Sequence, residues 1–341
     1  MAERKKLPLA VRIIAWVLGV VIGLLAVIWV GEKLVFASFF FGGAKAEMPI
    51  PGLWNGFVQQ GFDKLDDDTY LVAGYQKEKG KPSALYVIDR KGNEKDYVEL
   101  YNEDGTTAWT AHAGGVAHFN DWIYVAHNTG KANLEYSYCD RFLVEDVLDG
   151  DGKATRVDQI KLPNKISYCS VYDGKLYVGA FYREGSDYLT PESHQLKTPC
   201  DDQNTALLMV YSLGADGKPV AADGTTPDKV YSTLSNVQGM CMTESGKIVL
   251  ATSWGLSASH LYVYDETKAD KATLTLDGWS NAVELVYLDA TSLTQDVTAP
   301  PMAEELVYEN GRVLIMCESA SMKYIFGKLM SGNFVHSFPI A

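Results

Sequence analysis

The sequence lacks the short motifs that identify several large enzyme classes. It contains no GxSxG, HExxH, P-loop or GxGxxG, so no local pattern indicates a serine hydrolase, a zinc protease or a nucleotide-binding loop. Its five cysteines and six histidines show no CxxC or Cys-His spacing of the kind that holds zinc or performs redox chemistry. Stretches with the length and 3.6-residue period of a soluble amphipathic helix are also missing. An α/β fold built on parallel strands is therefore disfavoured.

Positive charge is scarce beyond the first 46 residues. The chain of 341 residues has 30 Lys and Arg against 43 Asp and Glu, a net charge of −13. After residue 46 there remain 24 basic and 41 acidic residues, so the net charge of that part is −17. Nucleic acid and anionic surfaces are poor partners for such a protein. With 47% hydrophobic residues the chain can still bury a large core.

One long uncharged run occurs near the amino terminus. Residues 13–30 read IIAWVLGVVIGLLAVIWV, close to the roughly 20 apolar residues that a helix needs to cross a bilayer. Trp16 and Trp29 lie near its ends, where indole rings favour the membrane interface. The run is preceded by four basic residues, Arg4, Lys5, Lys6 and Arg12. This pattern predicts a single transmembrane helix with a cytoplasmic amino terminus and everything after the span outside.

The domain boundaries follow from this span. Residues 1–12 are predicted to be a basic cytoplasmic tail, 13–30 the span, 31–47 a tether and 48–341 an extracytoplasmic domain. A cleaved signal peptide is the alternative, because residues 44–46 read AKA and fit the small-x-small processing rule. That site lies far beyond an apolar run that is long for a signal peptide, which favours a retained anchor.

Five stretches of the remaining chain share one pattern. Each consists of a short strand, a polar turn with Asp, Asn or Gly, and an apolar strand, as in SYCSVYDGKLYVGAFY. The second strands begin near Tyr70, Ile123, Leu176, Ile248 and Val313. These starts are 53, 53, 72 and 65 residues apart, close to the period of about 40 to 50 residues of propeller blades with some loop insertions.

Third strands follow each hairpin, and in most copies a fourth follows. The third strands are predicted at SALYVID, RFLVEDVL, ALLMVYSL, HLYVYD and, more weakly, KYIFGK. Four antiparallel strands per copy make a blade, so the sequence predicts an all-β fold, a five-bladed β-propeller. Six blades remain an alternative, because VELVYLDATS after HLYVYD resembles a further third strand. A β-sandwich or barrel is the other alternative, although those folds need no such period.

The loop lengths divide the predicted propeller into two unlike faces. The turns between first and second strands are tight, whereas the connections between second and third strands, residues 127–140, 183–204 and 253–260, are long. Antiparallel connectivity places these long connections on one face, here called the long-loop face, together with the starts of the innermost strands. Glu304 begins one such strand. Its counterparts are predicted near Asn55, His112 or Gly114, Ser167 or Tyr168, and Gln238.

Three short motifs at these strand starts carry a resemblance to a known family. Asn55-Gly56, Gln238-Gly239 and Ala303-Glu304 resemble the inner-strand signatures of calcium-dependent propeller lactonases of the gluconolactonase and senescence-marker type. The resemblance implies calcium in the central channel, with Glu304 and Asn55 as ligands. More broadly the chain resembles a group of membrane-anchored bacterial propellers. From the residues alone, one carboxylate with amides makes a weak calcium site, and the alternative is that a channel amide or an ordered water satisfies Glu304.

Further candidate residues lie on the same predicted face. Aromatic rings there are expected either to stack on a ligand or to pack between blades, and they are Trp54, Trp109, Tyr182 and Trp254. Cys139 and Cys200 each precede a third strand in neighbouring blades, which makes a disulfide between them plausible outside the membrane.

Two functions compete on this basis. The favoured one is a recognition module that binds a glycan, a peptide or a partner protein across the long-loop face. The alternative is a calcium-dependent, lactonase-like hydrolase with His112 as a base. Whether the protein is an enzyme is left open by the sequence.

Overall fold

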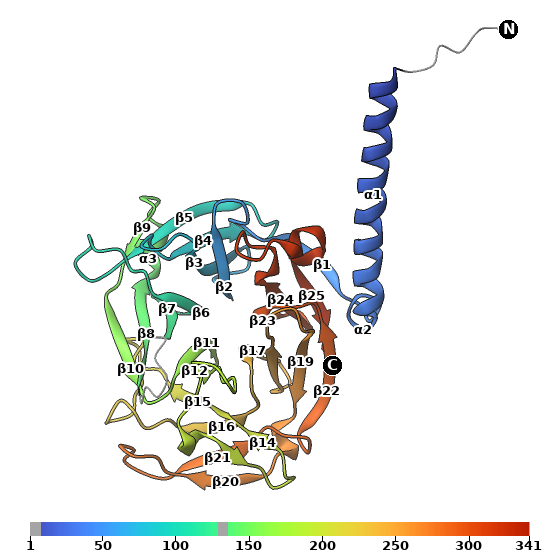
Figure 1. The fold of residues 1–341 in the computed structure, drawn as a ribbon. Helices are drawn as coiled ribbons and strands as arrows, with labels where there is room; N and C mark the ends of the chain where they lie inside the picture. The colour runs from blue at the N-terminus through green and yellow to red at the C-terminus, as the bar shows by residue number, and fades with distance from the viewer. Residues whose placement is uncertain (1–7, 129–135, 341) are drawn as a thin grey trace, which may run out of the picture.

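Five β-sheets stand around a central axis, and one long helix extends beside them (Figure 1). The computed structural model describes residues 8–128 and 136–340. Its ring of five sheets confirms the predicted five-bladed propeller, and the apolar helix at the amino terminus is confirmed with it. Part of the predicted 127–140 loop, residues 129–135, lies outside the described residues.

The first two blades are each built from four antiparallel strands that follow one another outward from the axis. Blade one contains β2 (Phe57–Lys64), β3 (Thr69–Gln76), β4 (Ala84–Asp89) and β5 (Glu94–Tyr101), with β9 (Lys153–Thr155) added in parallel at its outer edge. Blade two contains β6 (His112–Phe119), β7 (Trp122–Asn128), β8 (Ser137–Leu143) and β10 (Asp158–Leu162).

The remaining three blades complete the ring. Blade three contains β11 (Ile166–Tyr172), β12 (Lys175–Ala180), β15 (Ala206–Ser212) and β16 (Lys229–Thr233), and a small hairpin, β13 (Leu196–Lys197) with β14 (Gln203–Asn204), lies in its long loop. Blade four contains β17 (Val237–Met242), β18 (Ile248–Thr252), β19 (Ser259–Tyr264) and β22 (Leu293–Ala299). Blade five contains β23 (Ala303–Glu309), β24 (Arg312–Cys317), β25 (Phe334–Pro339) and β1 (Lys45–Pro49).

The few helices lie outside the sheets. The long helix is near the amino terminus and is followed by a four-residue helix, and the other short helices lie in connections between strands. In chain order the helices are α1 (Leu9–Val35), α2 (Ala37–Phe40), α3 (Val144–Leu148), η1 (Glu192–His194), η2 (Glu266–Lys268), η3 (Glu318–Ala320), η4 (Phe326–Leu329) and η5 (Ser331–Asn333).

Tight turns between first and second strands form where Asp-Gly or Asn-Gly pairs occur. Asp173 and Gly174 both have positive φ values, 49° and 67°, and Asn310 and Gly311 have 52° and 75°. Two successive left-handed residues define the type I′ turn, whose twist matches that of the flanking strands. The sequence pattern therefore determines these hairpins locally.

The hydrophobic core is divided among the blade interfaces. Five clusters of buried apolar side chains occur, one between each pair of neighbouring blades, including the pair formed by blades five and one. Because each sheet has apolar side chains on both faces, every blade needs two neighbours to be covered. Closing the ring satisfies all five.

Blade five is closed by the amino-terminal strand, a feature that the sequence reading missed. Its third strand is β25, whereas the predicted third strand KYIFGK lies instead among the short helices η3 to η5. Here Gly327 packs so closely on Ser319 that a Cβ atom would lie 2.5 Å from the Ser319 carbonyl carbon. The fourth strand is β1, which pairs with β25 from Lys45 to Pro49. The two ends of the propeller are thus joined by backbone hydrogen bonds.

The insertion in blade four does not form a sixth blade. Its hairpin, β20 (Lys271–Leu274) and β21 (Val283–Tyr287), leaves blade four and joins the outer edge of blade three, where β21 pairs in parallel with β16. In blade two, the predicted strand RFLVEDVL ends at Leu143 and continues as α3. The six-bladed alternative is therefore wrong.

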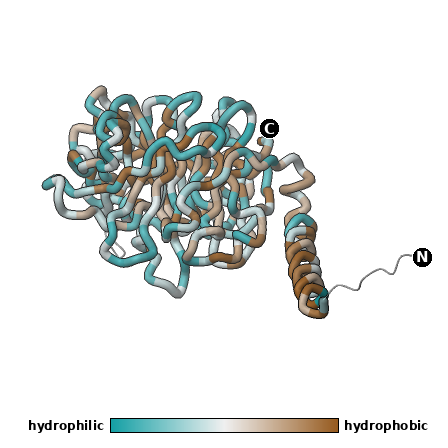
Figure 2. Tube along the Cα trace, turned by 90° about the horizontal axis from the view of Figure 1, so that it is seen from above, coloured by the Kyte–Doolittle hydropathy of each residue, from teal (hydrophilic) through white to brown (hydrophobic). Residues whose placement is uncertain are grey.

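Helix α1 is long and apolar enough to cross a membrane, and Figure 2 shows its hydrophobic colouring outside the propeller. The predicted tether, residues 31–47, is not a free linker. Its first residues belong to α1, and the buried Glu32 carboxylate accepts hydrogen bonds from the Ser331 amide and hydroxyl at 3.0 and 2.5 Å. Phe36 and Phe39 pack into the core between blades four and five. The helix is therefore attached to the propeller by its carboxyl-terminal end.

Candidate functional site

All five innermost strands carry a β-bulge near the start that opens on the long-loop face. The register shifts between Gln59 and Gly61 in β2, and at matching positions in the other four strands. The bulged residues are Gln60, Gly114 and Gly115, Ser167, Gln238, and Glu304 and Glu305. A bulge redirects side chains out of the regular alternation. Five of them around one axis bring side chains of five blades together.

A pocket of about 420 Å³ lies at this position and is here called the axial pocket. Every blade contributes to it, either through a bulge or through a neighbouring loop. Its lining consists of Gln60, Tyr75, His112, Gly114, Ser167, Phe181, Tyr188, Gln238, Ser253, Trp254, Gly255, Met302, Glu318, Lys323 and Tyr324. This volume is within the range of about 300 to 1,000 Å³ that is usual for small-molecule sites.

Glu318 supplies a nearly buried carboxyl group to the axial pocket. It lies at the start of η3, directly after β24, and Gln60 Nε2 donates a hydrogen bond of 2.7 Å to its Oε2 atom. Burial raises the pKa of Glu318 to about 7, although the positive charge of Lys323 and hydrogen bonds from Gln60 and Tyr324 oppose this shift. The group can therefore exchange a proton near neutral pH.

Glu304 lies deeper and is 1% exposed. Burial, followed by the negative charges of Glu318 and Glu305, raises its pKa well above the usual value. Within the described residues, its Oε1 atom has no hydrogen-bond partner. Because buried polar atoms are normally paired, this oxygen is an unsatisfied acceptor in the channel, although Glu304 is not among the residues that line the axial pocket.

Glu305 lies in the channel against the inner strands of neighbouring blades, and its Oε2 atom also has no hydrogen-bond partner among the described residues. Met240 N lies 3.4 Å from its Oε1 atom, and burial raises the pKa of Glu305 well above its ordinary value. The side chain fits because two neighbouring residues are glycines. A Cβ atom at Gly115 would meet the Glu305 carboxylate, and one at Gly239 would lie 2.6 Å from the Glu305 Cα atom.

His112 lines the axial pocket as predicted, beside Tyr75 and Lys323. Its ring centroid is 4.5 Å from that of Tyr75, and Lys323 Nζ donates a hydrogen bond of 2.6 Å to the Tyr75 hydroxyl. The crowded protein surroundings, followed by the positive charge of Lys323, lower the pKa of His112 to about 4, although the side chain is exposed at the pocket wall. The imidazole is therefore neutral at pH 7.

An aromatic wall faces these polar groups. Trp254 is 38% exposed, its ring stacks on Phe181 at 6.1 Å between centroids, and Tyr188 lies edge-on at 6.5 Å. The Arg183 guanidinium lies 4.0 Å from the centroid of the Trp254 ring. These rings come from the long loops of blades three and four, so the predicted ligand-binding Trp254 and Gln238 do lie together.

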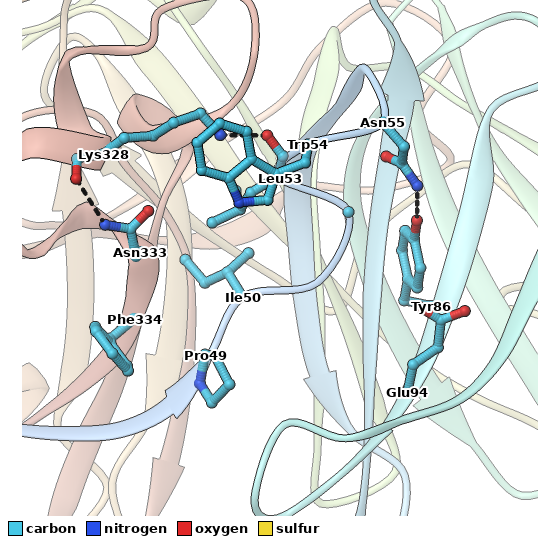
Figure 3. Close-up of a pocket in the computed structure, with 11 residues that line it drawn as sticks. Pro49, Ile50, Leu53, Trp54, Asn55, Tyr86, Glu94, Lys328, Asn333 and Phe334 are labelled. Carbon is cyan, nitrogen blue, oxygen red and sulfur yellow. Dashed lines mark hydrogen bonds between the residues drawn. The ribbon is translucent and has the colours of Figure 1, made fainter.

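Asn55 and Trp54 lie in a different cavity, between blades five and one (Figure 3). This interblade cavity has a volume of about 600 Å³. Asn55 Nδ2 donates a 2.5 Å hydrogen bond to the Tyr86 hydroxyl, and Lys328 Nζ lies 3.8 Å from the centroid of the Trp54 ring.

The two predicted calcium ligands, Asn55 and Glu304, therefore do not come together. In the described part of the chain, no group of three or more His, Cys, Asp or Glu side chains is arranged to hold a metal ion. The predicted alignment is in error by five residues, because the counterpart of Glu304 in blade one is the bulged Gln60. Asn55 lies in the loop that precedes β2.

The other predicted residues lie away from the axial pocket. Trp109 is 2% exposed and packs edge-on against Phe142 between blades one and two, and Tyr182 is half-buried beside the pocket-lining Phe181. Cys139 is buried in the core between blades two and three, whereas Cys200 is exposed. Both cysteines are free, so the predicted disulfide is not formed in this structure.

Sequence reasoning missed several pocket residues. Gln60 could have been found, because Gln60-Gly61 repeats the pair Gln238-Gly239 at the equivalent bulge of another blade. Glu318 follows β24 at the start of η3, and Lys323 and Tyr324 belong to the stretch KYIFGK for which the sequence predicts a strand. These residues reach the axis because of how η3 to η5 fold, and no pattern in the neighbouring sequence predicts that fold.

Comparisons with known proteins find solved structures with a similar fold. No family model matches the sequence, and no curated protein matches it. An aldose sugar dehydrogenase from Streptomyces coelicolor, solved with PQQ bound, has a TM-score of 0.49 and 12% identity over 86% of this chain and 97% of its own. A putative glucose dehydrogenase from Thermus thermophilus has a TM-score of 0.42 and 13% identity over 87% of this chain and all of its own.

A third solved structure, an exo-β-1,3-galactanase from Phanerochaete chrysosporium, has a TM-score of 0.47 and 11% identity. The match covers 87% of this chain and 64% of that chain. No residue role is transferred from any of these three structures.

Proposed function

We propose that the protein is a membrane-anchored recognition module whose propeller binds a neutral saccharide of one or two sugar units in the axial pocket. The observation that supports this most is the composition of the pocket, an aromatic wall facing amide and carboxyl groups. The calcium-dependent hydrolase receives no such support from the described side chains.

The chemistry of the pocket suits a sugar. The face of an aromatic ring carries partial negative charge and attracts the C–H groups on one side of a sugar ring. Gln60 and Gln238 offer both donors and acceptors, as hydroxyl groups require. Glu318, which lines the pocket and whose pKa burial raises to about 7, is partly protonated at neutral pH, and its protonated carboxyl group both donates and accepts hydrogen bonds.

The size and charge of the pocket narrow the class of ligand. A volume of about 420 Å³ accepts a small molecule and excludes a folded partner protein. His112 is neutral at pH 7, and the lining residues Lys323 and Glu318 carry charges of opposite sign, Glu318 being only partly ionised. A neutral ligand therefore suits the pocket better than a strongly charged one.

The arrangement in the cell forms part of the same proposal. The basic residues before α1 and the tryptophans at the ends of its apolar run favour an amino terminus in the cytoplasm and a propeller outside. The helix then acts as a retained anchor, and glycans outside the cell are within reach of the long-loop face.

The test compares two exposed tryptophans. The full chain, held in lipid nanodiscs, is titrated by calorimetry with glucose, galactose, N-acetylglucosamine and their disaccharides. Trp254→Ala removes the aromatic wall and is expected to weaken binding about ten-fold or more, which corresponds to the loss of about 1.5 kcal/mol of ring burial.

The matched control is Trp54→Ala, which removes a similarly cation-covered indole from the interblade cavity. This variant is expected to leave sugar binding unchanged. Equal effects of the two substitutions, or no heat from any sugar of the panel at millimolar concentration, would contradict the proposal.

A further inference from the structure

The segment that joins β24 to β25, residues 318–333, connects the helical anchor with two loops of blade one. Ser331 holds the Glu32 carboxylate at the end of α1. Lys328 Nζ donates a hydrogen bond to the carbonyl of Leu53, and its position beside Trp54 is visible in Figure 3. The carboxyl-terminal end of α1 and the 50–56 loop are thus both hydrogen-bonded to the 318–333 segment.

A second loop of blade one is tied to the same segment. Lys77 Nζ donates a 3.1 Å hydrogen bond to the carbonyl of Met322. The neighbouring Lys79 is exposed, and the acidic residue of this loop, Glu78, is paired with Lys81 at 2.9 Å. Positive charge therefore gathers here, in a propeller whose net charge is strongly negative.

Large apolar side chains of the 318–333 segment and of the 50–56 loop are exposed. Trp54 is 78% exposed, Ile325 50% and Leu329 49%. Ile325 also has a φ value of +65°, a left-handed conformation that is a clear outlier for a β-branched residue. Backbone strain of this kind persists where the surrounding structure holds a side chain in place, and it clusters at functional positions. Here it holds an apolar side chain in an exposed position.

We propose that this surface, formed by Trp54, Ile325, Leu329, Lys77 and Lys328, rests in the headgroup layer of the bilayer that holds α1. Three observations point to a lipid partner: the surface adjoins the end of the apolar helix, its apolar groups are an indole and two aliphatic chains, and its lysines outnumber the exposed acidic residue of the adjoining interblade cavity, Glu94. Indole rings and lysines are the side chains that favour the membrane interface, and lysines attract anionic headgroups.

This contact fixes the orientation of the propeller. A single span on a free linker leaves a domain able to rotate above the membrane, whereas Glu32 and the lipid-contacting surface together hold blades five and one toward the bilayer. The inference rests on the proposed membrane anchor and is independent of the identity of the sugar.

The test uses spin labels on the full chain in nanodiscs. Cys200→Ser removes the exposed cysteine, and the other four cysteines are buried. Single labels are placed through Ile325→Cys and Leu329→Cys. Two controls are Leu25→Cys within the apolar helix and Val220→Cys, which is 60% exposed in the β15–β16 connection of blade three.

The readout is the ratio of collision rates with oxygen, which enters lipid, and with a water-soluble nickel complex. At 325 and 329 we expect this ratio to be several-fold higher than at 220. The discs contain phosphatidylcholine alone or phosphatidylcholine with phosphatidylglycerol. A lipid signature in both discs supports contact through the apolar groups, and a signature confined to the anionic discs supports contact through the lysines.

Two results would overturn the proposal. The first is a nickel-accessible label at both 325 and 329 in both discs, and the second is a label shielded from both reagents, which would indicate contact with protein. The label at residue 25 distinguishes failure of the surface proposal from failure of the anchor proposal. If the label at 25 is in lipid while those at 325 and 329 are in water, only the lipid-contacting surface is rejected. If the label at 25 is in water, the membrane anchor is rejected together with the surface.

Discussion

The axial pocket and the interblade cavity present the same aromatic feature in different surroundings. In each, a cation covers an exposed tryptophan, Arg183 over Trp254 at 4.0 Å and Lys328 over Trp54 at 3.8 Å. The acidic groups differ. Glu318 beside the axial pocket is nearly buried, whereas Glu94, which lines the interblade cavity, is exposed.

The difference comes from position relative to the axis. The axial pocket receives bulged residues from inner strands of several blades, which pack on one another and exclude water. The interblade cavity is bounded by one blade junction and the loop before β2. An aromatic ring with a cation above it is therefore not sufficient to identify a binding site. The axial pocket differs because inner strands of several blades converge there and contribute buried polar groups.

The largest effect is expected from filling the space around the axis. Gly115→Ala places a Cβ atom against the Glu305 carboxylate and 2.7 Å from Cys169 N. Overpacking of this kind should lower the free energy of unfolding by about 3 kcal/mol, measured by denaturant unfolding of the full chain in detergent.

The comparison is Gly56→Ala, next to Asn55 at the interblade cavity. There a Cβ atom has room, 3.4 Å from Gln76 Oε1, but the φ value of +90° disfavours alanine. A loss of about 1 kcal/mol in the free energy of unfolding is expected from the left-handed backbone alone. If Gly56→Ala lowered the free energy of unfolding more than Gly115→Ala does, the residues around the axis would not be as crowded as described.

The second effect is on the pH dependence of stability. The pKa of Glu318 is raised from 4.5 to about 7. Between these values the unfolded chain releases its proton while the folded protein keeps it, so the free energy of unfolding falls as pH rises from about 4.5 to 7. Glu318→Gln should remove this loss, leaving the variant about 2 to 3 kcal/mol more stable than the parent above pH 7.

Thermal unfolding between pH 4 and pH 8 measures this change. Glu94→Gln at the interblade cavity serves as the control, and its dependence of thermal stability on pH should match that of the parent protein. If Glu318→Gln followed the parent profile throughout, the carboxyl group would not be buried as described.

The smallest effect is expected from calcium. The recognition module should show no change in melting temperature when calcium is added to the full chain or chelated. A calcium-dependent hydrolase would instead become more stable by mass action, and Glu304→Gln would abolish the gain. A calcium-dependent rise that Glu304→Gln removes would favour that alternative over the proposed sugar site.

Much of the fold is predictable because its units are local. A hairpin such as 166–180 contains its own alternating strands and its Asp-Gly turn, so its pattern is visible in consecutive residues. The predicted rim of the channel is right where a residue lies at the bulge itself, as with Gln238 and Ser167. It is wrong for Asn55, because an offset of five residues within a loop leaves no trace in the strand pattern.

The amino-acid sequence by itself determined the apolar helix, the five repeated hairpins and the contrast between long loops and tight turns. The tertiary structure alone decided that β1 closes blade five, that the hairpin β20–β21 joins blade three, and that Glu318 and Lys323 reach the axis beside Gln60. The physical reason is sequence separation. Hairpins form from neighbouring residues, whereas Gln60 and Glu318 are 258 residues apart and meet because the ring closes.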